Sequence, residues 1–269
     1  MKKYIPWLKA MRLTVTIPAG MLVHIGFKLA GKPTDWLLVI WIFIGASLAM
    51  LHNDYVDREH DLKKNRTFAC ENAFDLKNIL IAGWTILFFG SLTFFAPYAS
   101  LLLPVILISI LYSYCREIPV VQTICVAFAS ASPVIMTASS INVLGSINPN
   151  SVFFFVVFFA IYGREMIKDI EDVSIDVGYK ATLVSTGMQT IPVAYKEASF
   201  SIAVSLLILI FETMTRIPHP SIALAMTFFT GWIFCMFAVL AWTIDHSTLI
   251  GKRCFDIGMI IVLLSMIIF

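Results

Sequence analysis

The sequence predicts an all-α polytopic membrane protein with nine transmembrane helices. The 269-residue chain is 59% hydrophobic and only 13% charged, whereas a soluble domain is about half apolar and about a quarter charged. Its mean hydropathy is +0.87. The apolar residues occur along the whole chain in continuous runs that lack the alternation of strands, which favours helices over a β-barrel.

Nine segments reach the length of about 20 mostly apolar residues that a bilayer core requires. We expect them to form one transmembrane domain over residues 1–269. Similar acidic windows follow the second and sixth segments, which predicts two four-helix pseudo-repeats plus a last helix around a central cavity. The expected spans are 11–31, 36–52, 77–96, 98–115, 120–142, 149–168, 198–216, 220–243 and 254–269.

The positions of lysine and arginine predict the orientation of these spans. If the N-terminus is cytoplasmic, Lys28, Lys32 and Arg216 lie outside, and the other sixteen of the nineteen basic residues lie inside. We therefore expect the N-terminus and the long charged loops at 53–76 and 169–197 on the cytoplasmic side. A formal net charge of only +2 gives no reason to expect a nucleic-acid partner.

Nine of the seventeen acidic residues lie in two short windows, NDYVDREHD and REMIKDIEDVSID. Both windows contain the spacing Asp-x-x-Asp-x-x-x-Asp. On a helix the positions i, i+3 and i+7 share one face, where three carboxylates repel one another unless a cation is present. The two triads are Asp54, Asp57 and Asp61, and Asp169, Asp172 and Asp176.

Oxygen-only side chains of this kind favour a hard divalent cation, and among these Mg²⁺. Magnesium usually takes one or two carboxylates, keeps waters and shares phosphate oxygens with a substrate. The two triads therefore predict two Mg²⁺ ions that hold a diphosphate between them. One acidic cluster alone could equally be a solvated helix end, but two clusters of identical spacing near membrane depth favour a functional site.

These residues resemble the motifs of the UbiA superfamily of intramembrane prenyltransferases. The family's Asn-Asp-x-x-Asp-x-x-x-Asp motif is similar to the segment from Asn53 to Asp61, and its second aspartate motif is similar to the window that ends at Asp176. The family's Tyr-x-x-x-Lys motif reads YSYCR here, with Tyr112 in place and Arg116 instead of lysine. The nine expected spans also fit the family, so the resemblance covers essentially the whole chain.

The resemblance implies Mg²⁺-dependent transfer of an isoprenyl group from an allylic isoprenyl diphosphate to a lipophilic or aromatic acceptor within the bilayer. It implies that the six aspartates of the two triads are catalytic residues and metal ligands. Cations around the site would neutralise charge on the departing diphosphate. The expected diphosphate-binding residues are Asn53, Arg66, Tyr112, Arg116, Lys168 and Lys180.

Within the superfamily, the segment REMIKDIED looks most similar to the branch of digeranylgeranylglyceryl phosphate synthases. The segment Ile175-Asp176-Val177 departs from the family's Gly-Asp-Arg or Gly-Asp-Lys, so the resemblance leaves the acceptor, the prenyl chain length and the oligomeric state open. Lys168 could instead pair with Asp172 four residues later. Four polar residues of the fifth expected span could line a polar acceptor site or form hydrogen bonds between helices, and we favour the hydrogen bonds. They are Gln122, Ser130, Ser132 and Ser139.

Two other functions are compatible with a membrane protein of this kind. A terpene cyclase on the same scaffold would ionise the diphosphate identically but would use no acceptor. An ion or lipid transporter is the more remote alternative. Its carboxylates would be expected in the middle of spans, whereas here they lie at the ends.

Overall fold

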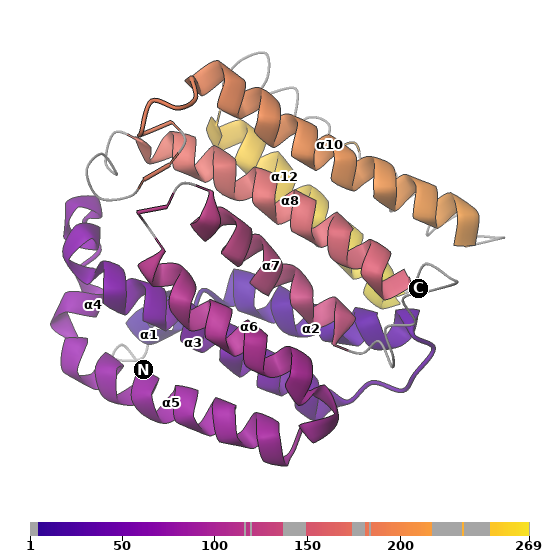
Figure 1. Ribbon diagram of the computed structural model, residues 1–269, viewed down its shortest axis with the longest axis horizontal. Helices are drawn as coiled ribbons and strands as arrows, with labels where there is room; N and C mark the ends of the chain where they lie inside the picture. Colours follow the sequence, from indigo (N-terminus) through magenta and orange to yellow (C-terminus); the bar gives the residue numbers. More distant parts are fainter. Residues whose placement is uncertain are drawn as a thin grey trace. The chain divides into compact units, whose positions relative to one another are not determined.

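The structure, a computed structural model, describes residues 5–115, 117–118, 120–136, 149–173, 181–182, 184–216, 233 and 248–268. Within these residues every regular element is a helix (Figure 1). The chain divides into two compact units. One is drawn from residues 1–117 and 132–139, and the other from residues 118–131 and 140–269.

Five of the described helices are long and apolar enough to cross a membrane. They are α3 (Trp36–Asp61), α5 (Ala73–Thr93), α6 (Ala99–Leu111) with its flanking 3-10 turns, α8 (Pro149–Glu171) and α10 (Ile191–Arg216). Two further apolar helices are shorter, α2 (Leu13–Leu29) and α7 (Val121–Ile135). The remaining helices are α1 (Ile5–Ala10), α4 (Phe68–Glu71) and α12 (Thr248–Ile268).

The helical prediction is confirmed for the described part of the chain. The expected spans up to 198–216 and the one at 254–269 each overlap a described helix. The expected span at 220–243 lies outside the described residues, apart from the single residue Ile233. The total of nine helices and the two four-helix repeats therefore remain predictions.

Two helices extend well beyond the apolar segments that predicted them. The expected span at 36–52 is the first part of α3, which continues to Asp61 and so makes the first aspartate triad part of the same helix. The expected span at 198–216 is the second part of α10, which begins at Ile191. Pro192 fits the first turn of α10 because the first N–H groups of a helix have no partner within it.

In the first unit, α3 packs against α2, α5 and α6. Its contact with α5 depends on Gly90, since a Cβ atom built at that position would lie 2.4 Å from the Trp41 ring. The indole N–H of Trp41 donates to the hydroxyl of Ser91 at 3.1 Å. Leu48, Leu76 and other apolar side chains fill the core between these helices.

In the second unit, α8 and α10 lie side by side through small residues, with α12 next to them (Figure 1). Gly163 of α8 faces the backbone of Ala198. The hydroxyls of Ser201 and Ser205 donate to α8 carbonyl oxygens at 2.9 and 2.7 Å. Small residues and hydroxyl hydrogen bonds are the usual means of joining helices in a membrane, where apolar burial cannot drive association.

Replacement of Gly163 by alanine should destabilise this helix pair. A Cβ atom there would lie 2.7 Å from the backbone oxygen of Ala198, so the helices must separate, at a cost of about 2 kcal/mol. Thermal unfolding of the purified protein in detergent measures the change. Gly45→Ala is the matched control, because its nearest contact would be an ordinary 3.6 Å to Leu87. Equal unfolding temperatures for both variants would contradict the prediction.

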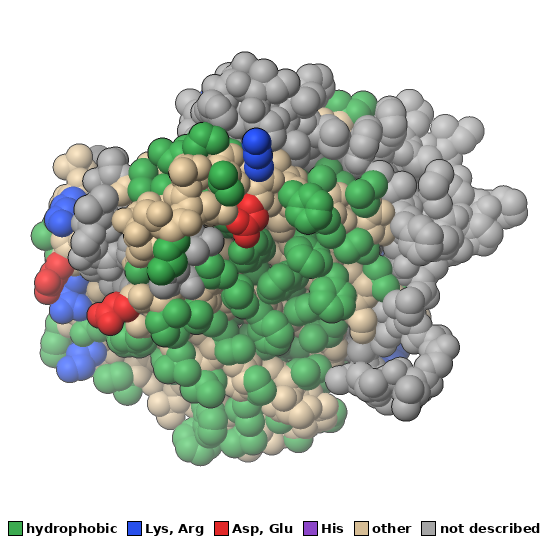
Figure 2. Space-filling model, turned by 45° about the horizontal axis from the view of Figure 1, so that its top comes forward, with side chains coloured by type: hydrophobic (Ala, Val, Ile, Leu, Met, Phe, Trp, Pro, Cys, Tyr) green, Lys and Arg blue, Asp and Glu red, His purple; other side chains and the backbone are tan. Residues whose placement is uncertain are grey.

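The described surface is largely apolar, as Figure 2 shows for one face. Large hydrophobic side chains are exposed on several helices, among them Leu37 (71% exposed), Phe74 (77%) and Phe200 (70%). Exposed apolar area of this extent is unusual for a protein in water and suits contact with lipid. Together with the five long apolar helices, it identifies an integral membrane protein.

Candidate functional site

The first aspartate triad lies on the last two turns of α3. Asp54 is paired with a cation and largely shielded from solvent: its Oδ1 lies 2.6 Å from Nη2 of Arg12, and its side chain is 14% exposed. Arg12 separates α1 from α2 and has a left-handed backbone (φ 50°), which costs an L-residue about 1–2 kcal/mol. Arg12, whose guanidinium contacts Asp54, therefore has a strained backbone conformation.

The other two members of the triad have partners nearby in the sequence. Asp57 Oδ2 accepts a hydrogen bond of 2.9 Å from the amide of Asn53, one turn earlier. Asp61 is buried, and its carboxylate lies 3.8 Å from Nη1 of Arg66, whose side chain is 61% exposed. The chain turns back at Asn65, which has a left-handed backbone (φ 56°), and this turn returns Arg66 to Asp61.

Tyr112, an expected diphosphate-binding residue, is buried at the end of α6. Its hydroxyl donates to the backbone oxygen of Ala49 in α3 at 3.4 Å. Nearby, the ring of His52 is also buried and its Nε2 lies 3.3 Å from the hydroxyl of Tyr114. The end of α6 is thus tied to α3 just before the first triad begins.

The second triad begins on α8, in the second unit. Asp169 is buried, and its Oδ2 accepts a 3.3 Å hydrogen bond from the hydroxyl of Thr123 on α7. Asp172 follows the last residue of α8, and its backbone N–H donates to the oxygen of Lys168. The third member, Asp176, lies outside the described residues, as do the expected diphosphate-binding residues Arg116 and Lys180.

Lys168, which the sequence allowed to pair with Asp172, contacts a different carboxylate in the described structure. Its Nζ lies 3.5 Å from Oε2 of Glu165. Glu165 also accepts a hydrogen bond of 3.0 Å from Arg164, whose Nε donates at 3.1 Å to Asp256 on α12. Lys168, which was expected to bind diphosphate, is therefore the last member of a series of four alternating charges that links α8 to α12. The series is Lys168, Glu165, Arg164 and Asp256.

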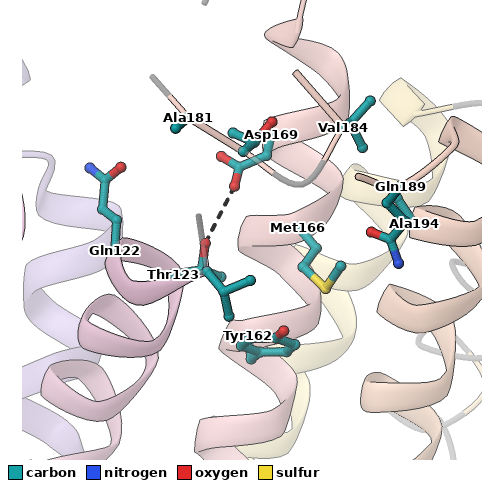
Figure 3. A pocket seen from close by; sticks show the side chains of 11 residues that line it. Gln122, Thr123, Tyr162, Met166, Asp169, Ala181, Val184, Gln189 and Ala194 are labelled. Carbon is teal, nitrogen blue, oxygen red and sulfur yellow. Dashed lines mark hydrogen bonds between the residues drawn. The ribbon is translucent and has the colours of Figure 1, made fainter. Parts of the chain in front are cut away.

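A small pocket, partly open to solvent, lies beside Asp169 between α7, α8 and the start of α10 (Figure 3). Gln122, Thr123 and Tyr162 contribute polar atoms to its wall, and Met166 contributes apolar surface. The remaining wall comes from Val120, Asp169, Ala181, Thr182, Val184, Gln189 and Ala194. Gln122, which the sequence allowed as part of a polar acceptor site, thus lines the small pocket next to the second triad.

No pattern in the sequence singles out Gln189, Glu197 or Asp256, yet all three make side-chain contacts in the second unit. Glu197 of α10 accepts hydrogen bonds from the hydroxyl of Tyr162, at 3.4 Å, and from the side-chain amide of Gln189. Asp256 lies within an apolar helix and contacts Arg164 from a distance of 92 residues along the chain. Only the presence of a charged residue in an apolar segment could have drawn attention to Glu197 and Asp256.

The donor chemistry of the triads fits magnesium. The carboxylate and amide oxygens of Asn53, Asp54, Asp57 and Asp61 are hard ligands on the polar end of α3. In the described part of the chain, no three carboxylate, imidazole or thiol groups lie close enough to hold a metal by themselves. One or two carboxylates completed by water and phosphate oxygens, the usual arrangement for magnesium, match these residues.

Comparisons with known proteins agree with this picture. The model of the UbiA prenyltransferase family matches residues 15–253. A structure of digeranylgeranylglyceryl phosphate synthase is similar with a TM-score of 0.70 and 19% identity, covering 100% of this chain and 98% of the other. The apo structure of a UbiA homologue from Aeropyrum pernix K1 is similar with a TM-score of 0.73 and 16% identity, covering 94% and 97%.

No curated protein matches the sequence significantly. At 16–19% identity the two solved structures establish the shared fold, whereas the family match spans most of the chain and includes both aspartate windows up to Asp176. The apolar helices, the aspartate motifs at their ends and this match lead to one conclusion. The chain belongs to the UbiA prenyltransferase family and is a prenyltransferase of the membrane.

Proposed function

We propose that the enzyme transfers an isoprenyl group from an allylic isoprenyl diphosphate to a lipophilic acceptor, with Mg²⁺ bound at the two aspartate triads. The observation that carries this proposal is the continuation of α3 from an apolar span into a helical turn of carboxylates, without an intervening loop. Such a helix places hard metal ligands directly beside the apolar region where an isoprenoid tail is soluble.

The proposed roles follow from charge and exposure. Asp54, Asp57 and Asp61 would supply metal ligands from α3, and Asp169, Asp172 and Asp176 would supply them from the second window. Bound magnesium neutralises charge that develops on a departing diphosphate. Arg66 and Lys168 are cations close to a triad, with side chains that are 61% and 42% exposed. We assign them to the diphosphate oxygens together with Asn53, Tyr112, Arg116 and Lys180.

In the reaction, the allylic C–O bond breaks and its electron pair leaves with the diphosphate. An electron pair of the acceptor then forms the new bond to the allylic carbon, and the acceptor loses one proton, which the released diphosphate can take. Water would quench the allylic cation, so the reacting carbon must lie in apolar surroundings. The positive-inside distribution of lysine and arginine supports a site on the cytoplasmic side.

Removal of magnesium should abolish the reaction. The purified protein, incubated with radiolabelled geranylgeranyl diphosphate and a panel of lipid and aromatic acceptors, should release diphosphate and form a prenylated product only when Mg²⁺ is present. A chelator should stop both, and added Mg²⁺ should restore both, because the carboxylates and the diphosphate repel one another without a cation. Transfer that continues at full rate in the chelator would contradict the metal assignment. A cyclised product formed without acceptor would contradict transfer.

A further inference from the structure

Arg12 contacts the first aspartate triad but has no role in the proposed transfer. Its Nη2 donates to Oδ1 of Asp54 at 2.6 Å, a short hydrogen bond between two charged groups. The side chains of Arg12 and Asp54 are 30% and 14% exposed, so solvent screens this pair less than a pair on the open surface. Asp54 therefore has a counter-charge of its own, with which a metal ion at this carboxylate must compete.

The backbone on both sides of Arg12 keeps its side chain near Asp54. The N–H of Arg12 donates to the oxygen of Lys9 at 3.1 Å. The oxygen of Arg12 accepts from the N–H groups of Val15 and Thr16, at 2.7 and 3.1 Å. Arg12 thus joins α1 to the first turn of α2. Because these hydrogen bonds hold the backbone in place, the positive charge stays within the reach of one side chain from Asp54.

Arg66, the second arginine at this triad, is held much less tightly. Its Nη1 lies 3.8 Å from Oδ1 of Asp61, and its side chain is 61% exposed, so the pair contributes little that would keep it there. Arg66 can therefore turn toward a diphosphate, whereas the guanidinium of Arg12 is bound to Asp54. The two arginines differ in this respect: one is available to the substrate, and the other neutralises an expected metal ligand.

These contacts leave the first triad with little negative charge to attract a free metal ion. Its three carboxylates and the two arginines together carry a charge of −1. A divalent ion that bound here alone would make this cluster positive and would lie close to the like charge of Arg12. Magnesium also gives up its hydration water reluctantly. A diphosphate supplies negative charge and phosphate oxygens together, and so removes both obstacles.

We propose that Arg12 is a positioning residue that makes the binding of Mg²⁺ at Asp54 depend on the isoprenyl diphosphate. Arg12 neutralises Asp54 and repels a free divalent ion, and the negative diphosphate offsets this repulsion when metal and substrate bind together. The coupling is reciprocal, so the metal must strengthen diphosphate binding by the same factor. This inference rests on the proposed function and adds the order of assembly, in which metal and diphosphate bind together and the metal does not bind first.

The test measures metal binding without catalysis. Mn²⁺ takes the same oxygen ligands as Mg²⁺, and electron paramagnetic resonance reports its free concentration beside the purified protein in detergent. Without diphosphate, Arg12→Gln should bind Mn²⁺ about tenfold more tightly than the wild type, because a neutral amide replaces a close and partly shielded cation. Geranylgeranyl S-thiolodiphosphate, an analogue that ionises slowly, should strengthen Mn²⁺ binding by the wild type, and by a factor about tenfold smaller in Arg12→Gln.

Matched variants separate this effect from a change in net charge. Arg12→Lys keeps the charge and should bind Mn²⁺ within about twofold of the wild type. Arg58→Gln removes the same charge from the same end of α3, but Arg58 contacts Glu59 and the ring of Tyr55, so its effect should also stay within about twofold. The double variant Arg12→Gln/Asp54→Asn should lose the gain in affinity, because the tighter site requires the Asp54 carboxylate.

Three results would overturn this inference and leave prenyl transfer in place. Equal Mn²⁺ affinity in Arg12→Gln and the wild type would make the pair with Asp54 purely structural. Weaker binding by Arg12→Gln would show that Arg12 orients Asp54 for the metal and does not compete with it. Wild-type protein that binds Mn²⁺ as tightly without the analogue as with it would also contradict the proposal, and this comparison requires no variant to fold. Weak Mn²⁺ binding by the wild type even with the analogue, together with transfer that does not depend on Mg²⁺, would overturn the proposed function itself.

Discussion

Replacement of Asp54 by alanine should reduce Mg²⁺-dependent prenyl transfer by about 10²- to 10³-fold, the loss expected when a group that stabilises developing charge is removed. Asp54 occupies the first position of the triad on α3, and its carboxylate is held by Arg12 at 2.6 Å with only 14% of its side chain exposed. The variant should lose both the metal ligand and the partner that neutralises Arg12. Single-turnover transfer with labelled diphosphate measures the effect on the chemical step.

Glu59→Ala is the matched control for Asp54→Ala. Glu59 lies in the same acidic window, but its side chain is 85% exposed and its contact with Arg58 is 3.6 Å long, so we expect its rate to stay within about twofold of the wild type. Asp172→Ala tests the second window in the same assay and should show a loss similar to that of Asp54→Ala. If Asp54→Ala retained the rate of Glu59→Ala, the first triad would not bind the metal.

Arg164→Ala should destabilise the protein by about 2 kcal/mol, less than a fully buried ion pair would cost, because the side chains of Arg164 and Asp256 are 24% and 44% exposed. The Arg164 guanidinium lies between two carboxylates, at 3.0 Å from Glu165 and 3.1 Å from Asp256. Without it, Glu165 still contacts Lys168, at 3.5 Å. Lys168 would then be drawn to Glu165, and the KM for the diphosphate should rise.

Thermal unfolding in detergent and the KM for the diphosphate together test this network. Arg164→Lys should recover only part of the stability, because an ammonium group cannot reproduce a guanidinium fork that contacts two carboxylates through different nitrogens. The exposed Arg253 of α12 provides the control, since removal of an exposed charge typically changes stability by less than about 0.5 kcal/mol. An Arg164→Ala protein as stable as Arg253→Ala would show that this series of charges contributes little to folding.

The helices and the aspartate motifs could be predicted because their signals are local in the sequence. Apolar runs identify spans, and the spacing of Asp54, Asp57 and Asp61 identifies one helical face. The extent of α3 and α10 was underestimated, because hydropathy measures where a helix leaves the apolar region and not where its hydrogen bonds end. Capping by Asp35 and the position of Pro192 set the starts of these two helices.

The partners of the site residues could not be predicted in this way. Arg12 and Asp54 are 42 residues apart, and Arg164 and Asp256 are 92 residues apart. Such contacts depend on how helices pack, which leaves no periodic trace in a single sequence. The same holds for Glu197, which accepts hydrogen bonds from Tyr162 and Gln189 only once their separate segments have come together.

The length of α3 also determines how the substrate can arrive. The helix has 26 residues and is about 39 Å long, whereas a hydrocarbon core is about 30 Å thick. Its last turns, with Asp57 and Asp61, therefore reach the depth of the lipid headgroups. An isoprenyl diphosphate dissolved in the leaflet carries its own headgroup at this depth. We therefore expect capture by lateral diffusion in two dimensions, so that turnover should follow the mole fraction of the substrate in the bilayer and not its concentration in bulk solution.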